Sequence, residues 1–197
     1  MAINRNLVSW SRTVHIYLSI ALLLVLIFFS VTGITLNHAT SLTAEPETSV
    51  QMLDGIPELP RDENDLIIAS PELESFIRQQ FGVRLSQASM IHEDDLLIID
   101  YRAPGKIGYI EFDLVFDEIF AETTDYGLIA ALNDLHKARD TTVIWNWLID
   151  ISGVILVVFS LAGFVLLLPN KYRLKKVSRY TVVALGILTA GYYLGNL

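Results

Sequence analysis

The sequence predicts a membrane protein with three transmembrane α-helices and an α+β insert outside the membrane. Two observations support this prediction. The chain has 197 residues, 52% of them hydrophobic, and a mean hydropathy of +0.46, which is too apolar for a soluble domain. All 22 acidic residues except Asp150 lie between Glu45 and Asp140. The net charge of −8 therefore belongs to one soluble segment, and we expect no nucleic-acid partner.

The first span is expected over residues 14–37, after an N-terminal segment of residues 1–13. No acidic residue, lysine or arginine occurs from there to Thr40, and about 20 apolar residues suffice to cross a bilayer. A cleaved signal peptide is the alternative, because Arg5 and Arg12 precede the apolar run. We expect a retained anchor, since the run is long for a signal peptide and no A-x-A-like site follows it.

The second and third spans are expected over residues 142–168 and 180–197. Trp145 and Trp147 stand at the start of the second span, where tryptophan anchors a helix at the membrane surface. Pro169 cannot continue the helix and is expected to end this span. The third apolar run is just long enough to cross.

The basic residues predict the orientation of the spans. Residues 169–179 contain five bases and no acid, and the positive-inside rule makes this segment a cytoplasmic loop, with residues 1–13 on the same side. Residues 38–141 and the C-terminus then lie outside, in the periplasm of a Gram-negative cell. The sequence thus predicts a multi-pass protein of the bacterial inner membrane.

The insert is expected to form a helix beside an antiparallel meander. Residues 45–65 are rich in Pro, Glu and Asp and are expected to be irregular. Ser70 followed by Pro71 is typical of a helix start, and Gly82 of a helix end. Residues 126–139 return to helical spacing and lead into the second span. The strands are expected over residues 85–91, 96–101, 106–112 and 115–121.

Three histidines at the expected ends of spans are the candidate cofactor ligands: His15, His38 and His136. Histidine in a bilayer usually faces a partner, a cavity or a cofactor, although an interfacial histidine also satisfies headgroups or backbone. The chain has no cysteine, which excludes iron–sulfur clusters and covalent c-type haem and leaves imidazole as the haem ligand. His92, beside Glu93, is expected to be a solvated turn residue.

Three short segments around these histidines resemble the PepSY-associated transmembrane family. The segments TGITLNH at 32–38, LHKAR at 135–139 and SLAG at 160–163 are similar to the family's "TG…LNH", "LHKGR" and "SLTG" segments. The likeness covers the spans and their edges, and it extends to a PepSY-like insert only by pattern. The family's "D…TG" strand turn is replaced by DLVFD at 113–117, and Ala138 replaces a common glycine.

The resemblance implies a small inner-membrane, haem-containing ferric reductase. Family members include ferric and ferric-siderophore reductases that bind b-type haem through histidines at span edges, so His15, His38 and His136 become candidate axial ligands. The implied function is to pass electrons across the membrane to periplasmic ferric iron or a ferric chelate, in support of iron uptake. The reductant would be a membrane quinol or a cytoplasmic flavin. The alternatives are a non-enzymatic, membrane-anchored PepSY regulatory or binding module and an electron-transfer subunit for another acceptor.

Spacing divides the three histidines into an outer pair and an inner one. His15 and His38 are 23 residues apart, roughly 34 Å along a helix, and so belong to opposite membrane faces. His38 and His136 both belong to the outer face and could hold one haem, within one protomer or across two. His15 has no second histidine on its side. Haem b at both faces therefore requires a homodimer.

Charged residues near the histidines are the remaining candidates. Arg12 and Arg139 are expected to pair with haem propionates, since a guanidinium binds a carboxylate bidentately; Lys137 is a weaker candidate. Their alternatives are membrane anchoring for Arg12 and a helix-end charge for Arg139. Asp150, inside the second span, is a candidate proton carrier or hydrogen-bond partner of a ligand imidazole, or a structural contact to another span.

The acidic insert offers oxygen ligands for Fe³⁺, but no spacing among its acids picks out a site. A solvated acidic face is the expected arrangement. No nucleophile–base pair, phosphate-binding loop or zinc-ligand spacing occurs in the sequence.

Overall fold

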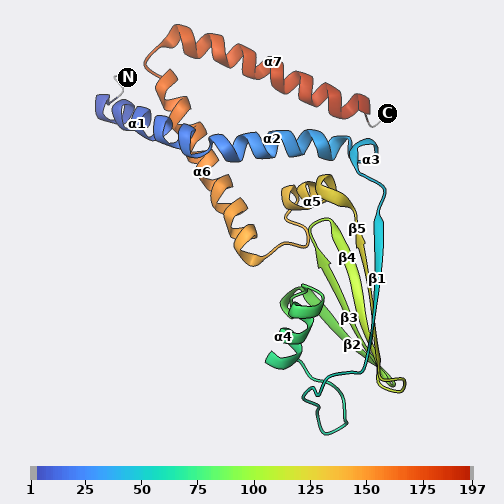
Figure 1. The fold of residues 1–197 in the computed structure, drawn as a ribbon. Coiled ribbons are helices and arrows are strands. Elements are labelled where there is room, and N and C mark those ends of the chain that lie inside the picture. Colours follow the sequence, from blue (N-terminus) through green and yellow to red (C-terminus); the bar gives the residue numbers. More distant parts are fainter. Residues whose placement is uncertain (1–3, 196–197) are drawn as a thin grey trace. The chain divides into compact units, whose positions relative to one another are not determined.

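The computed structural model describes residues 4–195 (Figure 1). The chain divides into two compact units. One comprises the chain up to Leu26 and from Asp150 onwards, and it is helical. The other, Ile27–Ile149, contains the sheet.

The sheet unit is built on five antiparallel strands in the order β1-β5-β4-β3-β2 (Figure 1). The strands are β1 Glu47–Asp54, β2 Ala88–Glu93, β3 Leu96–Ala103, β4 Lys106–Asp113 and β5 Glu118–Asp125. The last four follow one another as a meander, and β1 pairs with β5 from Glu47↔Asp125 to Asp54↔Glu118. The expected helix beside an antiparallel sheet is present.

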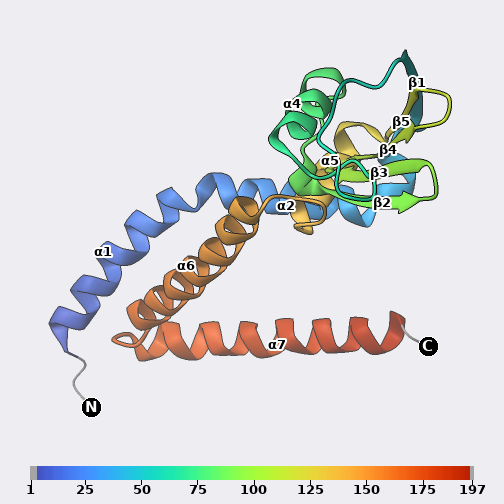
Figure 2. The ribbon, with the colours of Figure 1, turned by 90° about the horizontal axis from the view of Figure 1, so that it is seen from below.

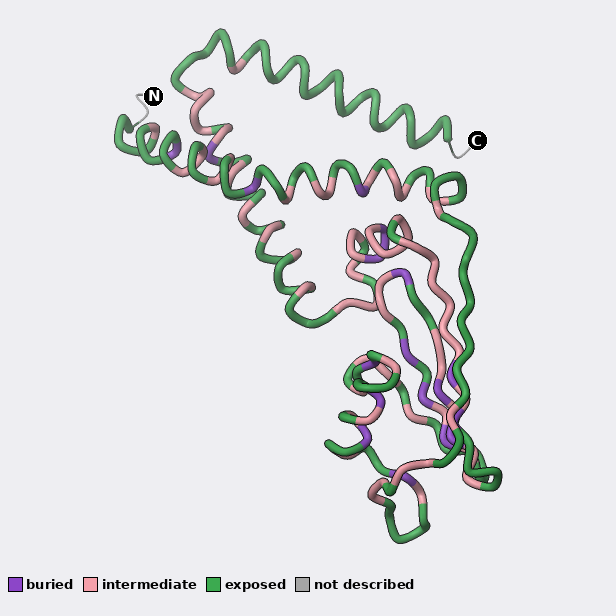
Figure 3. The backbone as a smooth tube through the Cα atoms, viewed as in Figure 1, coloured by how far each residue is buried: buried purple, intermediate pink, exposed green. Residues whose placement is uncertain are grey.

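Helix α4, Pro71–Gln80, lies on one side of the strands, as the view in Figure 2 shows. The Ser70 hydroxyl accepts the Leu73 N–H at 3.1 Å, and Gly82 takes the left-handed conformation after the helix, as the sequence predicts. Burying an aliphatic side chain here stabilises the fold by roughly 1.5–3 kcal/mol. The fully buried core, purple in Figure 3, comprises Ile67, Leu73, Ile77, Leu97, Ile99, Ile110, Phe112 and Ile119.

Strand β1 lies in the segment that was expected to be irregular, so the prediction for residues 45–65 is wrong over Glu47–Asp54. All but one of its residues are exposed, because β1 is an edge strand that places little on the core. Such a strand lacks the alternation of buried and polar residues that marks strands in sequences. The other boundary difference is small: Leu85–Gln87 forms a 3₁₀ turn before β2.

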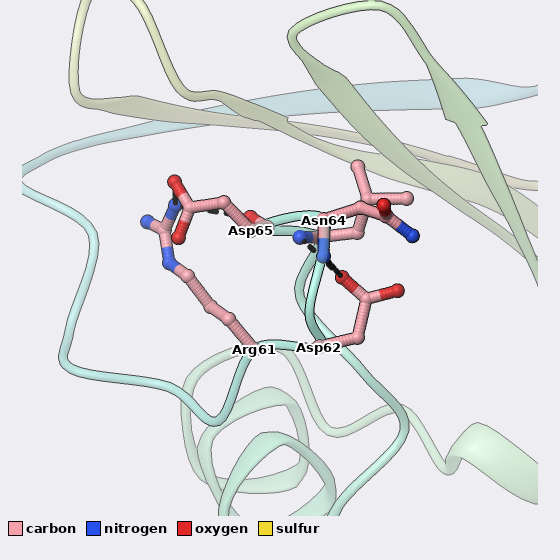
Figure 4. Close-up of polar contacts among 5 residues, drawn as sticks. Arg61, Asp62, Asn64 and Asp65 are labelled. Atoms are coloured by element: carbon pink, nitrogen blue, oxygen red, sulfur yellow. Dashed lines mark hydrogen bonds and ion pairs between the residues drawn. The ribbon is translucent and has the colours of Figure 1, made fainter.

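His92 is exposed, as expected, but it lies in β2 and not in the turn that follows this strand. Its Nε2 is 2.9 Å from the carbonyl oxygen of Ile67 and donates to it. The bond fixes the end of the loop that precedes α4. This loop is closed at its tip by an ion pair between Arg61 and Asp65 at 3.0 Å (Figure 4).

The expected first span over residues 14–37 is not one continuous helix. Two helices replace it, α1 Arg5–Ala21 and α2 Leu23–Asn37, with a bend of 54° at the break. The Ser19 hydroxyl donates to the carbonyl oxygen of Ile16 at 2.7 Å, one turn before the break, and such back-bonding bends helices. Together, α1 and α2 are long and apolar enough for one broken span.

Helix α6, Val143–Leu167, coincides with the second expected span. Its most apolar window has a hydropathy of 2.4, and by length and composition it can cross a membrane. By the same measure, no other single helix among residues 4–195 does so. Two residues of the third expected span, 196–197, and three of the N-terminal segment, 1–3, lie outside the described residues.

Helix α7, Lys171–Gly195, runs through both the expected basic loop at 169–179 and the expected third span. The loop prediction is wrong beyond Asn170, whose side chain caps α7 by accepting the Arg173 N–H at 3.0 Å. Lysine and arginine are good helix formers, so a run of them extends a helix once a cap is present. α7 has no buried residue, and its tube in Figure 3 is green along almost its whole length.

We predict that acid opens the loop of Figure 4 through Asp62. The backbone N–H groups of Leu66 and Asn64 each donate to Asp62 Oδ1 at 2.9 Å, and they hold the pKa of this carboxyl below its ordinary value. The loop is therefore intact above the pKa of a free aspartate and loosens as the pH falls through the lowered pKa. Hydrogen exchange at the Leu66 amide measures the transition. An acid transition that persists in Asp62→Asn contradicts this assignment.

Candidate functional site

His136 is the last residue of α5, Gly127–His136, and the end of this helix is tightly fixed. The Arg139 N–H donates to the Asp134 carbonyl at 2.9 Å and the Ala138 N–H to the Leu135 carbonyl at 3.3 Å. These two bonds form a Schellman motif, which satisfies the last carbonyls of a helix. The backbone of His136 is thus held by the turn that follows it.

The imidazole of His136 lies against α2. Its Nδ1 is 2.7 Å from the hydroxyl oxygen of Thr32, and its ring meets Phe29 edge-on with centroids 5.1 Å apart. Gly33 lies next to the ring, since a Cβ built there would be 3.6 Å from Cε1 of His136. Beside this contact, Thr35 is hydrogen-bonded to the buried Asn133 at 2.9 Å. α5 is therefore fastened to α2 at two adjacent turns.

The hydrogen bonds of Thr32 determine which nitrogen of His136 carries the proton. The Thr32 hydroxyl lies 2.7 Å from the carbonyl oxygen of Phe28, which can only accept. Its single hydrogen is used there, so the hydroxyl oxygen accepts the Nδ1–H of His136. Nε2 is left with a free lone pair, and no hydrogen bond to it occurs within residues 4–195.

His15, on α1, has the same arrangement on another helix. Its Nδ1 is 3.0 Å from the carbonyl oxygen of Phe159, so Nδ1 carries the hydrogen and Nε2 is free. The ring stacks on that of Phe159, with centroids 4.2 Å apart and 8° between the planes. It also covers Gly163, where a Cβ would be only 2.9 Å from Cε1 of His15.

His38 is not brought together with His136. It lies in the turn after α2 and precedes the short helix α3, Ala39–Leu42, and its side chain is exposed. In the described part of the chain, no hydrogen bond or ring contact joins it to His136. Its carbonyl accepts the Ser41 and Leu42 N–H groups, each at 3.1 Å.

Arg139 is already paired. Its guanidinium lies 2.5 Å from Asp134 and 3.8 Å from Asp140, which fits the helix-end alternative. Asp134 is buried, and its other oxygen accepts the Gly105 N–H at 2.9 Å, which fastens α5 to the turn between β3 and β4. Arg12 is exposed and forms no ion pair with any residue in 4–195.

Asp150 is exposed on α6, with no hydrogen bond or ion pair to the rest of the described chain. The alternative of a structural contact to another span is therefore not found within residues 4–195. Nor do these residues place three or more His, Asp or Glu side chains together around a possible metal position. The acids of the insert form no such group within the described residues.

A cavity of about 680 Å³ lies in the sheet unit. Its polar lining includes Asp100, Arg102, Tyr109 and Glu122. Burial raises the pKa of Tyr109, and the carboxylates of Glu122 and Glu111 raise it further. Tyr109 thus remains a neutral phenol, and its hydroxyl is hydrogen-bonded to the side chain of Glu122.

A model of the PepSY_TM-like family matches residues 9–191. The chain belongs to this family. Comparisons with curated proteins and with solved structures gave no match. The matched range includes all three segments on which the resemblance rests, and a membrane location is consistent with the family and with α6.

The PepSY_TM-like segments have distinct roles in the structure. Thr32 bonds His136 and Gly33 lies beside its ring, whereas Gly163 gives room to the ring of His15. Sequence reasoning selected both histidines but missed Thr32 as the partner of His136. The available signal was its place in TGITLNH, one of the three segments on which the family resemblance rests.

Ala138→Gly is expected to stabilise the protein by about 0.5–1 kcal/mol. Ala138 has φ of +55°, in the left-handed region that disfavours residues with a Cβ, which explains the glycine common in the family. Thermal unfolding of the full chain in detergent measures the gain. The matched control, Ala130→Gly inside α5, is expected to lose up to about 1 kcal/mol. Equal losses in both variants would refute the prediction.

Gly163→Ala is expected to displace the ring of His15, because the new Cβ would lie 2.9 Å from Cε1. The ring would then lose its bond to the Phe159 carbonyl. Ring ¹⁵N chemical shifts of the full chain in detergent report this loss directly. Gly33→Ala is the control, since its Cβ would be at an ordinary 3.6 Å from His136. The prediction fails if the two variants disturb their histidines equally.

Proposed function

We propose that this PepSY_TM-like protein is a b-haem protein of the bacterial inner membrane that passes electrons outward to reduce periplasmic ferric iron. One observation carries the proposal: His15 and His136 both bond Nδ1–H to a neighbouring helix and leave Nε2 free. A histidine that binds a metal almost always donates its other ring N–H to a fixed acceptor, which sets the tautomer and the ring orientation. Both residues meet this requirement.

Haem, when bound, supplies one-electron transfer, because its iron cycles between the ferric and ferrous states. The chain contributes the imidazole nitrogens of His15 and His136, and His38 is a further ligand at the outer face. Imidazole is the fitting donor in a chain without cysteine.

In this proposal the chain crosses the membrane with residues 1–13 in the cytoplasm and the sheet unit in the periplasm. The basic residues at the start of α7 support this orientation. A membrane quinol that gives up two electrons and two protons reduces two Fe³⁺ ions, or their chelates, to Fe²⁺. A cytoplasmic flavin is the alternative donor. Asp150, a carboxylate in α6, takes up a proton in the quinol route.

The proposal includes a homodimer. Each copy brings one His15 to the inner face, so two copies are needed to place two imidazoles on one iron there. At the outer face, His38 and His136 bind within one protomer or across two. Arg12 is available for a propionate, whereas Arg139 would first have to leave Asp134.

The polar cavity of the sheet unit favours a second candidate function. Its 680 Å³ is within the range of small-molecule sites. A membrane-anchored module that binds a ligand in this cavity and carries no haem would be colourless. An electron-transfer subunit for another acceptor would be coloured but would not reduce ferric iron.

Absorption spectroscopy of the full-length protein, purified in detergent from haem-supplemented cells, separates these functions. We expect a Soret band and a bis-histidine b-type spectrum on reduction. His15→Ala and His136→Ala should each lose most of the haem at their site, and His38→Ala tests the outer partner. His92→Ala is the control, since His92 bonds the Ile67 carbonyl inside the sheet unit. A colourless wild-type protein, or equal loss in all four variants, refutes the haem assignment.

Ferric reduction is measured on the coloured protein. Oxidation of the dithionite-reduced form by a ferric chelate, with a ferrous chelator trapping the product, should give one Fe²⁺ per haem. A reduced protein that stays reduced under ferric chelate is an electron carrier for another acceptor.

A further inference from the structure

We propose that Thr32 is a positioning residue that commits His136 to the tautomer with hydrogen on Nδ1. The use of the free Nε2 as an iron ligand rests on the function proposed above. The tautomer itself is a property of the chain and can be tested without haem.

The hydroxyl of Thr32 has two partners and one hydrogen. Phe28 O and His136 Nδ1 each lie 2.7 Å from Thr32 Oγ1. If the hydroxyl donated to Nδ1, two oxygens would face each other at 2.7 Å with no hydrogen between them. The arrangement in which Thr32 donates to Phe28 O and accepts from Nδ1–H makes both bonds.

The burial of Thr32 strengthens the preference of its hydroxyl for this hydrogen-bond arrangement. Thr32 is 2% exposed, so water does not compete for its hydroxyl. A neutral imidazole in water exchanges between its two tautomers, whereas a part-buried hydrogen bond to one nitrogen favours one of them by about tenfold. Thr32 therefore acts as the selector of the tautomer.

The surroundings keep the ring in place while Thr32 selects the proton. Phe29 meets the ring at its edge, and the Schellman motif fixes the backbone of His136. The bond from Thr35 to Asn133 holds the preceding turn of α5 on α2 independently of Thr32. Loss of the Thr32 hydroxyl should thus change the tautomer without releasing the helix.

His15 reaches the same tautomer by a different route, and this makes it an internal reference. Its acceptor is the backbone carbonyl of Phe159, which never donates. No substitution at Thr32 removes that acceptor. Of the two rings, only that of His136 depends on a side chain for its tautomer.

The test is the ring ¹⁵N spectrum of histidine-labelled, haem-free full-length protein in detergent, at a pH where the rings are neutral. In the wild type, we expect Nδ1 of His136 to show a protonated shift and Nε2 an unprotonated one. Thr32→Val should return His136 towards a mixture of tautomers, a shift of about tenfold in their ratio. Thr32→Ser keeps the hydroxyl and should keep the wild-type spectrum.

Thr35→Val is the matched control, since it removes a hydroxyl one turn away that bonds Asn133 instead. It should leave the tautomer of His136 unchanged, and His15 should be unchanged in every variant. A wild-type His136 with its hydrogen on Nε2 overturns the proposal, whether or not Thr32→Val folds. So does a folded Thr32→Val variant that keeps the Nδ1–H tautomer.

Haem binding separates this proposal from the function on which it rests. In haem-loaded protein, Thr32→Val should weaken haem retention by roughly 10–100-fold, and Thr32→Ser should not. A colourless protein that shows the expected tautomers refutes the haem function and leaves the role of Thr32 standing. A coloured protein in which Thr32→Val leaves the tautomer of His136 unchanged refutes the role of Thr32 and leaves the haem function standing.

Discussion

The bond between Thr32 and His136 joins the two ends of the sheet unit. About 100 residues separate them, and bringing the ends of so long a segment together costs chain entropy that only contacts at the junction can offset. The neighbouring bond from Thr35 to Asn133 supports the same junction. Because both bonds lie on one face of α2 and one face of α5, the unit begins and ends on the same pair of helices.

Asp134 extends this junction to the sheet. Its buried carboxylate accepts the Gly105 N–H and pairs with Arg139, so its charge is compensated on both oxygens. Gly105 has φ of +72° and lies against Ala131, where a Cβ would be 2.8 Å from the backbone nitrogen. The turn between β3 and β4 is therefore bonded to Asp134, which lies two residues before His136 in α5.

The sequence predicted the elements whose ends carry a chemical signal. Ser70, Pro71 and Gly82 marked α4 because capping is local, and α6 was evident from its apolar length. β1 could not be predicted, since an exposed edge strand has no buried face to give a pattern. The start of α7 was mistaken for a loop because its charges indicated topology, whereas helix formation depends on the cap at Asn170. Thr32 was missed because its partner lies 104 residues away.

The two glycines beside the histidines, Gly33 and Gly163, differ in how closely the neighbouring imidazole ring approaches them. A glycine inside a helix costs about 1 kcal/mol relative to alanine. The ring of His15 lies against Gly163, where it leaves no room for a Cβ. At Gly33 the ring of His136 leaves ordinary room, and no other described residue comes within 4 Å of a Cβ there. An alanine at position 33 would therefore fit beside the ring of His136, whereas an alanine at position 163 would displace the ring of His15.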